Sequence, residues 1–218
     1  MEVAGLLLTG GRSRRMGADK ALLVAMSSGP GAGPGGDTLA ARTARLLAQV
    51  AGPCLEVGPG VSGLAALREE PAGAGPLVAV AAGGQALAAA GWAGPVLVVA
   101  TDLPVLSVAV LEWLAEHRAF GSVVPIAGSP QPLCARWSAA DLDLAVDLVA
   151  GGARAMSDLV AAAAPTLAGA DDPGGPGSAA LADADTPDDA RRLGLKFAPR
   201  PDPPGGAGLT GRLHIGNR

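Results

Sequence analysis

The N-terminal segment places the strongest constraint on how this chain can fold. Residues Val3–Leu8 are a continuous apolar run, which is typical of a strand buried in a parallel sheet. The run ends at once in the glycine-rich, basic segment Thr9–Gly17, TGGRSRRMG. A buried strand followed by a glycine-rich turn and a helix can bind phosphate, because backbone N–H groups point at the ligand. The sequence therefore predicts an α/β fold with a phosphate site at the end of its first strand.

The rest of the chain alternates short apolar runs with longer helical patterns. Further strands are expected at 53–57, 95–100, 122–126, 131–137 and 181–182. Helices are expected from Asp37 or Thr38 to about Val50, then at 76–90, 108–118, 139–149 and 155–163, with a last one starting at Thr186–Asp189; Ser107 is a candidate cap for the third. This alternation predicts a Rossmann-like three-layer sandwich with a mostly parallel central sheet.

A length of 218 residues suits one α/β domain, with two domains as the second reading. We expect residues 1–198 to form this domain. Residues 27–36 are nearly all Gly, Pro, Ser and Ala and are expected to be a flexible loop, and residues 171–178 another loop. From residue 199 onward the chain is rich in Pro and Gly and lacks periodicity, so residues 199–218 are expected to be a disordered tail.

Charge and cysteine content exclude several classes of protein. The net charge of −4 argues against a nucleic-acid partner, which normally requires a basic face. Cys54 and Cys134 have no metal-ligand spacing, so both are expected to be small buried hydrophobic residues rather than zinc ligands or a disulfide.

The apolar stretches are too short to cross a bilayer, which takes about 20 residues. With Glu2 preceding the first strand, no signal peptide is expected, and we expect a cytoplasmic protein.

The basic residues of the first motif point to a ligand with several phosphates. Arg12, Arg14, Arg15 and Lys20 fall within one short segment, which is more positive charge than a single phosphate requires and fits a triphosphate. The spacing is neither the GxGxxG of dinucleotide binders nor a P-loop, because Lys20 is not followed by Ser or Thr. Lys occurs only at positions 20 and 196 in this Arg-rich chain, which favours a specific role for Lys20. The alternative is a solvated basic run on an exposed helix.

A second candidate site follows the predicted strand at 95–100. Asp102 comes directly after this strand, in the turn Thr101–Pro104. Open α/β sheets bind ligands beyond the carboxyl ends of their strands, and Mg²⁺ prefers one or two carboxylates together with phosphate oxygens and water. Asp102 is therefore a candidate Mg²⁺ ligand. The alternative is that Asp102 only caps a turn.

These residues carry a resemblance to a known family. Residues 8–20, LTGGRSRRMGADK, resemble the signature LAGGxSxRMGxDK of the molybdenum cofactor guanylyltransferases, which belong to a wider nucleotidyltransferase superfamily. Further segments resemble family elements in the family's order: 69–77 the acidic stretch ending in GxGPL, 102–104 its DxP, 132–135 its PLxA strand, 152–156 its GxR segment and 183–189 its NxNTPED element. The resemblance covers about residues 3 to 193.

The resemblance implies transfer of GMP from GTP to the terminal phosphate of molybdopterin carrying molybdenum, with release of pyrophosphate. It implies Mg²⁺ as cofactor, and as partners a nucleoside triphosphate, a molybdopterin-type acceptor and molybdoenzyme maturation proteins. By position, the residues expected to contact the nucleotide are Leu8, Thr9, Gly10, Gly11, Lys20, Glu69 and Asp102. Those expected to act in catalysis are Lys20, Arg15 and Asp102, and those expected to bind metal are Asp102 and Asp185.

Several departures from the family pattern keep other functions open. Thr9 stands where Ala is usual, Glu69 where Asp is usual, and Asp183 and Asp185 where guanylyltransferases show Asn. The Asp form is similar to the cytidylyltransferase branch, whereas the Gly-Gly turn and Asp19 favour GTP over CTP. The alternatives are a cytidylyltransferase, a sugar-phosphate or deazaflavin-precursor enzyme of the same fold, and a non-catalytic nucleotide-binding adaptor. Retention of Lys20 and Asp102 argues against the adaptor.

Overall fold

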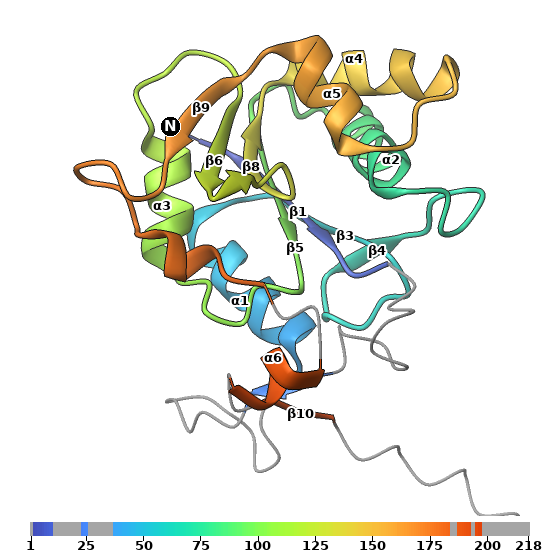
Figure 1. Ribbon diagram of the computed structural model, residues 1–218. Helices are drawn as coiled ribbons and strands as arrows, with labels where there is room; N and C mark the ends of the chain where they lie inside the picture. Colours follow the sequence, from blue (N-terminus) through green and yellow to red (C-terminus); the bar gives the residue numbers. More distant parts are fainter. Residues whose placement is uncertain (1, 11–22, 26–36, 184–186, 193–194, 198–218) are drawn as a thin grey trace, which may run out of the picture.

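The computed structural model describes residues 2–10, 23–25, 37–183, 187–192 and 195–197 (Figure 1). The expected loop at 27–36 and the expected tail at 199–218 lie outside these residues. Within the described part, helices and strands alternate as the apolar pattern predicts, and no helix is both long and apolar enough to cross a membrane.

An eight-stranded sheet forms the centre of the molecule, in the order β4-β3-β1-β5-β8-β6-β7 with β9 paired to β6. Its strands are β1 (Ala4–Leu8), β3 (Cys54–Val57), β4 (Ala65–Leu67), β5 (Val96–Ala100), β6 (Val123–Ala127), β7 (Ser129–Pro130), β8 (Cys134–Trp137) and β9 (Thr166–Gly169). β4, β3, β1 and β5 are mutually parallel, as are β6 and β9. β8 runs antiparallel between β5 and β6, and β7 is antiparallel to β6. The short strands β2 (Leu23–Ala25) and β10 (Leu195–Phe197) form a separate antiparallel pair.

Helices cover both faces of the large sheet, which confirms the predicted three-layer Rossmann-like sandwich. The helices are α1 (Leu39–Val50), α2 (Pro76–Ala89), α3 (Val108–Glu116), α4 (Ala139–Ala150), α5 (Met156–Ala163) and the short α6 (Pro187–Arg192). α2 packs against α4, and α4 against α5, on one face, whereas α1 and α3 pack together on the other. Figure 1 shows the first group above and to the right of β1 and β5, and the second below and to the left.

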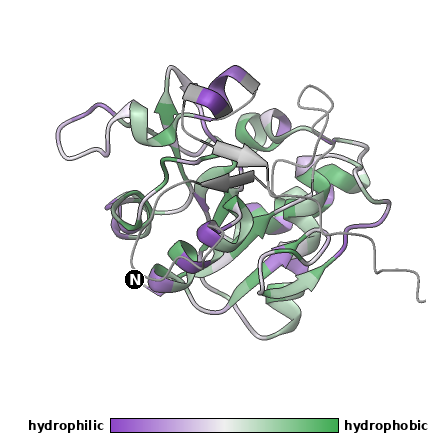
Figure 2. Ribbon diagram, turned by 90° about the horizontal axis from the view of Figure 1, so that it is seen from below, coloured by the Kyte–Doolittle hydropathy of each residue, from purple (hydrophilic) through white to green (hydrophobic). Residues whose placement is uncertain are grey.

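The central strands are apolar throughout because both of their faces are buried. In β1, Leu6 and Leu8 belong to the cluster under α2 and α4, whereas Leu7 belongs to the cluster under α1 and α3. β5 alternates in the same way, with Val98 in the first cluster and Val99 in the second. Figure 2 shows these hydrophobic segments running through the middle of the fold. The core is built mainly from Ala, Val and Leu, with Trp137 its largest fully buried side chain.

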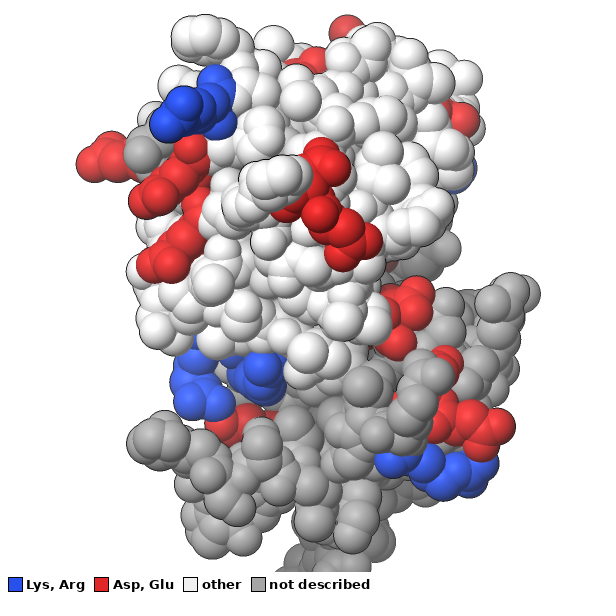
Figure 3. All heavy atoms as spheres, turned by 60° about the vertical axis from the view of Figure 1, so that its left-hand side comes forward, with Lys and Arg blue, Asp and Glu red and all other residues white. Residues whose placement is uncertain are grey.

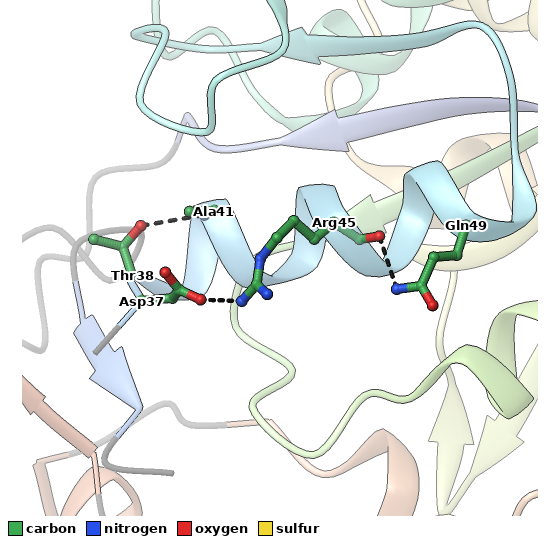
Figure 4. Close-up of polar contacts among 5 residues, drawn as sticks. All are labelled: Asp37, Thr38, Ala41, Arg45 and Gln49. Atoms are coloured by element: carbon green, nitrogen blue, oxygen red, sulfur yellow. Dashed lines mark hydrogen bonds and ion pairs between the residues drawn. The ribbon is translucent and has the colours of Figure 1, made fainter. Parts of the chain in front are cut away.

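The start of α1 is fixed by local polar contacts (Figure 4). Thr38 caps the helix, since its Oγ1 accepts a hydrogen bond of 3.1 Å from the N–H of Ala41. Asp37, the other predicted cap, instead pairs with the guanidinium of Arg45, eight residues further along the chain. Gln49 Nε2 donates to the carbonyl of Arg45 at 3.1 Å. Ser107 occupies the cap position of α3 as predicted, but its side chain accepts no hydrogen bond from that helix.

The structure also corrects two expectations. The predicted strand at Leu181–Ala182 is wrong: Ser178–Leu181 form a 3₁₀ helix, because the N–H groups of Ala180 and Ala182 bond to carbonyls three residues back rather than to a strand. Cys134 is a buried free thiol as predicted, but Cys54, also free, is only half-buried.

Candidate functional site

Three parallel strands end side by side at one edge of the sheet. Leu8 in β1 pairs in register with Ala100 in β5 and with Val57 in β3. The chain therefore leaves the sheet at neighbouring points as Thr9–Gly10, as Thr101–Asp102 and as Gly58. This edge is where open α/β sheets bind ligands. The register thus places Gly10 and Asp102, from segments far apart in the sequence, at the same edge.

Gly10 lies against the carboxylate of Glu69. A methyl group built on Gly10 would lie 3.6 Å from Glu69 Oε1 and 3.8 Å from Oε2. The Glu69 side chain is 7% exposed, and its Oε1 accepts a hydrogen bond of 2.9 Å from the N–H of Gly73. No described residue donates to Oε2. The structure therefore brings together two of the residues for which a nucleotide contact is predicted.

Gly58 permits a close approach between the ends of β3 and β1. Its φ of +154° is rarely adopted by residues with a side chain. A Cβ at this position would overlap Thr9 Oγ1 and would lie 2.8 Å from the backbone nitrogen of Gly10. The N–H of Thr9 also donates to the carbonyl of Val57 at 3.1 Å. The first residues of the glycine-rich turn thus pack directly on Gly58.

Glu56, which no sequence motif singles out, is a fully buried carboxylate behind the start of the turn. Glu56 accepts hydrogen bonds from the hydroxyl of Thr9, from the N–H groups of Gly60 and Val61, and from both the N–H and the hydroxyl of Ser62. Burial by itself raises the pKa of Glu56, but the bonds from Ser62, Thr9 and Val61 outweigh it and hold this pKa below its ordinary value. The one signal in the sequence is an acidic residue inside the predicted strand at 53–57.

Asp102 is half-buried at the end of β5, close to the start of β8. β8 runs antiparallel to β5 with Cys134 opposite Val99, and the N–H of Ala100 donates to the carbonyl of Leu133 at 2.8 Å. Burial, and to a smaller extent the negative charge of Asp102, raise the pKa of Cys134 to about 12. The Cys134 thiol therefore stays protonated at neutral pH.

The donor set around Asp102 fits a hard cation that also binds substrate. Within the described residues, no group of three or more His, Cys, Asp or Glu side chains could hold a metal by itself. Mg²⁺ does not need one, because it is usually held by one or two carboxylates with substrate phosphates and water. The position of Asp102 at this sheet edge is consistent with such a site.

Two other segments that resemble family elements meet at the start of α2. Gly75 has φ +123°, and a Cβ there would lie 2.7 Å from the carbonyl oxygen of Arg154. The N–H of Leu77 donates to the same oxygen at 3.3 Å. Arg154 is exposed, and its Nη1 donates to the carbonyls of Val149 and Ala153 at 3.0 and 2.6 Å. Residues 75–77 (GPL) and 152–154 (GAR), each of which resembles an element of the same family, are therefore in direct contact.

The remaining predicted residues are placed as follows. Leu8 is buried at the end of β1, with 6% exposed, and Thr9 is buried at 4%. Gly11, Arg15, Lys20 and Asp185 lie outside the described residues. On the face shown in Figure 3, charged side chains lie in small groups, in some of which acidic and basic side chains adjoin, with uncharged surface between the groups.

Comparison with known proteins shows that the chain resembles nucleotidyltransferases. Residues 5–164 match the family described as MobA-like NTP transferase domain. A probable molybdenum cofactor guanylyltransferase of Mycobacterium avium is 37% identical over 170 residues, which cover 73% of this chain and 81% of that protein. A probable molybdenum cofactor guanylyltransferase of Opitutus terrae is 36% identical over 173 residues, covering 73% of this chain and 78% of that protein.

Solved structures with low sequence identity share the fold. Molybdopterin-guanine dinucleotide biosynthesis protein A from Archaeoglobus fulgidus superposes with a TM-score of 0.65 at 19% identity, over 88% of this chain and 97% of that one. The 2-C-methyl-D-erythritol 4-phosphate cytidylyltransferase of Thermus thermophilus gives a TM-score of 0.60 at 20% identity, over 88% and 97% of the two chains. The fold is thus common to enzymes named for different nucleotides and acceptors.

Proposed function

Because the chain belongs to the MobA-like NTP transferase family, we propose that it transfers the GMP moiety of GTP to the phosphate of a molybdopterin-type acceptor and releases pyrophosphate. The observation that carries this proposal is that Gly10 lies against Glu69, and that Gly10 and Asp102 both follow the carboxyl ends of adjacent parallel strands. This arrangement supports one site bordered by the predicted phosphate turn, the predicted nucleoside contact and the predicted metal ligand. The relatives named guanylyltransferases support GTP as the donor.

Transfer of GMP to a phosphate acceptor requires little acid–base catalysis. A phosphate oxygen of the acceptor forms a bond to the α-phosphorus of GTP. The bond from that phosphorus to the oxygen bridging the α- and β-phosphates breaks, and its electron pair leaves with pyrophosphate. The attacking oxygen is already anionic, so no strong general base is required. The main barrier is the approach of two polyanions, which positioning and positive charge lower.

Six of the predicted residues have a role in this scheme. Backbone N–H groups from Gly10 onward would face the phosphates, and the carboxylate of Glu69 would face the nucleoside. Lys20 and Arg15 would neutralise charge that develops on the phosphates in the transition state. Asp102, with Asp185 as a second candidate, would hold Mg²⁺, which supplies positive charge to the triphosphate oxygens when it is bound.

The test is pyrophosphate release by the full chain with Mg²⁺ and molybdopterin carrying molybdenum, compared for GTP, CTP, ATP and UTP. We expect release with GTP that depends on the acceptor. Lys20→Ala and Asp102→Ala should each lower the rate by about a hundredfold or more, since each removes a charge that acts on the transition state, while both variants keep the wild-type melting temperature.

Other outcomes have distinct meanings. Faster release with CTP would show that the base assignment is wrong. Near-normal rates in either variant would show that the residue assignment is wrong. No release with any nucleotide in the wild type would favour a binding protein without this reaction.

A further inference from the structure

The carboxylate of Glu56 organises the loop that follows β3. Its Oε1 accepts hydrogen bonds from the N–H groups of Gly60 and Val61 at 2.7 and 3.0 Å. Its Oε2 accepts from the N–H and the hydroxyl of Ser62 at 2.8 and 2.5 Å. Because the side chain is fully buried, these donors replace water around the charge. Residues 58–62 are thereby folded around one ionised group.

The same carboxylate also binds the residue that begins the glycine-rich turn. The hydroxyl of Thr9 donates to Glu56 Oε1. The N–H of Thr9 donates to the carbonyl of Val57 at 3.1 Å, so both the side chain and the backbone of Thr9 are tied to β3. Since its hydroxyl and its N–H are both engaged inside the protein, Thr9 would act on a ligand by setting the direction of the backbone that follows it.

These contacts determine the position of the Gly10 backbone, which follows Thr9. Gly58 packs against Thr9 and against the backbone nitrogen of Gly10, and Glu69 also lies beside Gly10. Gly10 is itself exposed at the sheet edge. A rotation of Thr9 would therefore move the Gly10 backbone relative to Glu69.

We propose that Thr9 and Glu56 are a positioning pair, in which a buried charge-assisted hydrogen bond fixes the Thr9–Gly10 backbone for binding of a nucleoside triphosphate. The ligand class rests on the function proposed above. Neither side chain touches the reacting atoms. Their effect is exerted through the direction of the backbone N–H groups that follow, because a small displacement of positioning groups weakens contacts to a ligand strongly.

The chain offers a matched control for this pair. Thr9→Val removes one hydroxyl donor to Glu56 and keeps the shape of the side chain. Ser62→Ala also removes one hydroxyl donor to the same carboxylate, but Ser62 belongs to the far end of the loop and keeps its backbone bond to Oε2. Ser62→Ala also loses the bond that its hydroxyl accepts from the N–H of Leu64 at 3.3 Å. It should therefore lose at least as much stability as Thr9→Val, so weaker ligand binding in Thr9→Val alone reports on positioning.

The experiment measures the Kd of GTP with Mg²⁺ by isothermal titration calorimetry on the full chain, with melting temperatures for every variant. Thr9→Val should weaken binding by about tenfold, the effect of roughly one hydrogen bond to a charged group. Thr9→Ser, which keeps the hydroxyl, should restore most of the affinity. Ser62→Ala should bind GTP within about twofold of the wild type, because its missing bond lies away from Gly10.

Equal affinity in Thr9→Val and the wild type would overturn the positioning role, as would equal weakening in Thr9→Val and Ser62→Ala. If the wild-type protein binds GTP, neither of these two results would contradict the proposed function. A wild type that binds none of the four nucleoside triphosphates would overturn both the proposed function and this inference.

Discussion

Replacing Gly58 with Ala is the sharpest test of the geometry at the sheet edge. The added methyl group would overlap Thr9 Oγ1 and would lie 2.8 Å from the nitrogen of Gly10. Its backbone φ of +154° is also unfavourable for alanine. Both effects act on the residues that lead into the predicted phosphate turn.

The size of the effect follows from two contributions. Placing a non-glycine residue in such a conformation costs about 1–3 kcal/mol. Relieving the overlap costs a further ~1–3 kcal/mol of the kind seen on overpacking. The sum of about 4 kcal/mol is a large part of the 5–15 kcal/mol that is typical of a folded domain. For a chain of this size it corresponds to a melting temperature lower by roughly 8–16 °C.

The assay is urea denaturation followed by circular dichroism, together with the Kd for GTP. Gly63→Ala is the matched control, because Gly63 also has positive φ, at +88°, but its added Cβ would meet no atom within 4 Å. The control should lose only about 1–2 kcal/mol and keep its GTP affinity. If Gly58→Ala is no less stable than Gly63→Ala, the close approach of β1 and β3 is wrong. If it is less stable but binds GTP normally, this edge does not bind the nucleotide.

Three further predictions concern the surrounding structure. The buried Arg136 donates to five backbone carbonyls at the end of α3 and in the loop after it, and two of these carbonyls belong to the buried residues Leu114 and Ala115. Arg136→Met should therefore lower the free energy of unfolding, measured by urea titration, by about 4 kcal/mol. A loss below about 1 kcal/mol would contradict this role. Folding lowers the pKa of Glu56 from 4.5, so the unfolded chain binds more protons than the folded chain. Glu56 should therefore stabilise the fold above pH 4.5, and this contribution is lost as the pH falls through the pKa of the folded state. Glu56→Gln should make the free energy of unfolding depend less on pH in that range. Because the pKa of Cys134 is raised to about 12, its thiol should react with iodoacetamide at pH 8 far more slowly in the native protein than in urea, and equal rates would show that it is accessible and ionised.

The sequence predicted the centre of the fold well because its strands are buried on both faces. β1 and β5 are apolar at every position, so their pattern does not depend on knowing which elements cover them. β4 and β9 were missed for the opposite reason. Both are short and largely exposed, and they are strands only because they pair with β3 and β6.

The candidate site shows a similar division. Motif order and strand ends were enough to single out Gly10, Glu69 and Asp102, since each follows a local pattern. The sequence could not show that Glu69 lies against Gly10, or that Gly75 lies on Arg154, because these contacts depend on tertiary packing. Glu56 was missed because an isolated carboxylate in an apolar strand gives no indication of the donors that will surround it.

The central claim is that Asp102 and the end of β1 border one site for a nucleoside triphosphate and Mg²⁺. The most direct measurement is the Kd of GTP with Mg²⁺ and with EDTA, for wild type, Asp102→Ala and Asp143→Ala, the last an exposed carboxylate on α4. We predict that Mg²⁺ tightens GTP binding by about tenfold or more in the wild type and in Asp143→Ala, because a metal that bridges carboxylate and phosphate couples the two sites. Asp102→Ala should lose this dependence while remaining folded. Undiminished Mg²⁺ dependence in Asp102→Ala would contradict the account.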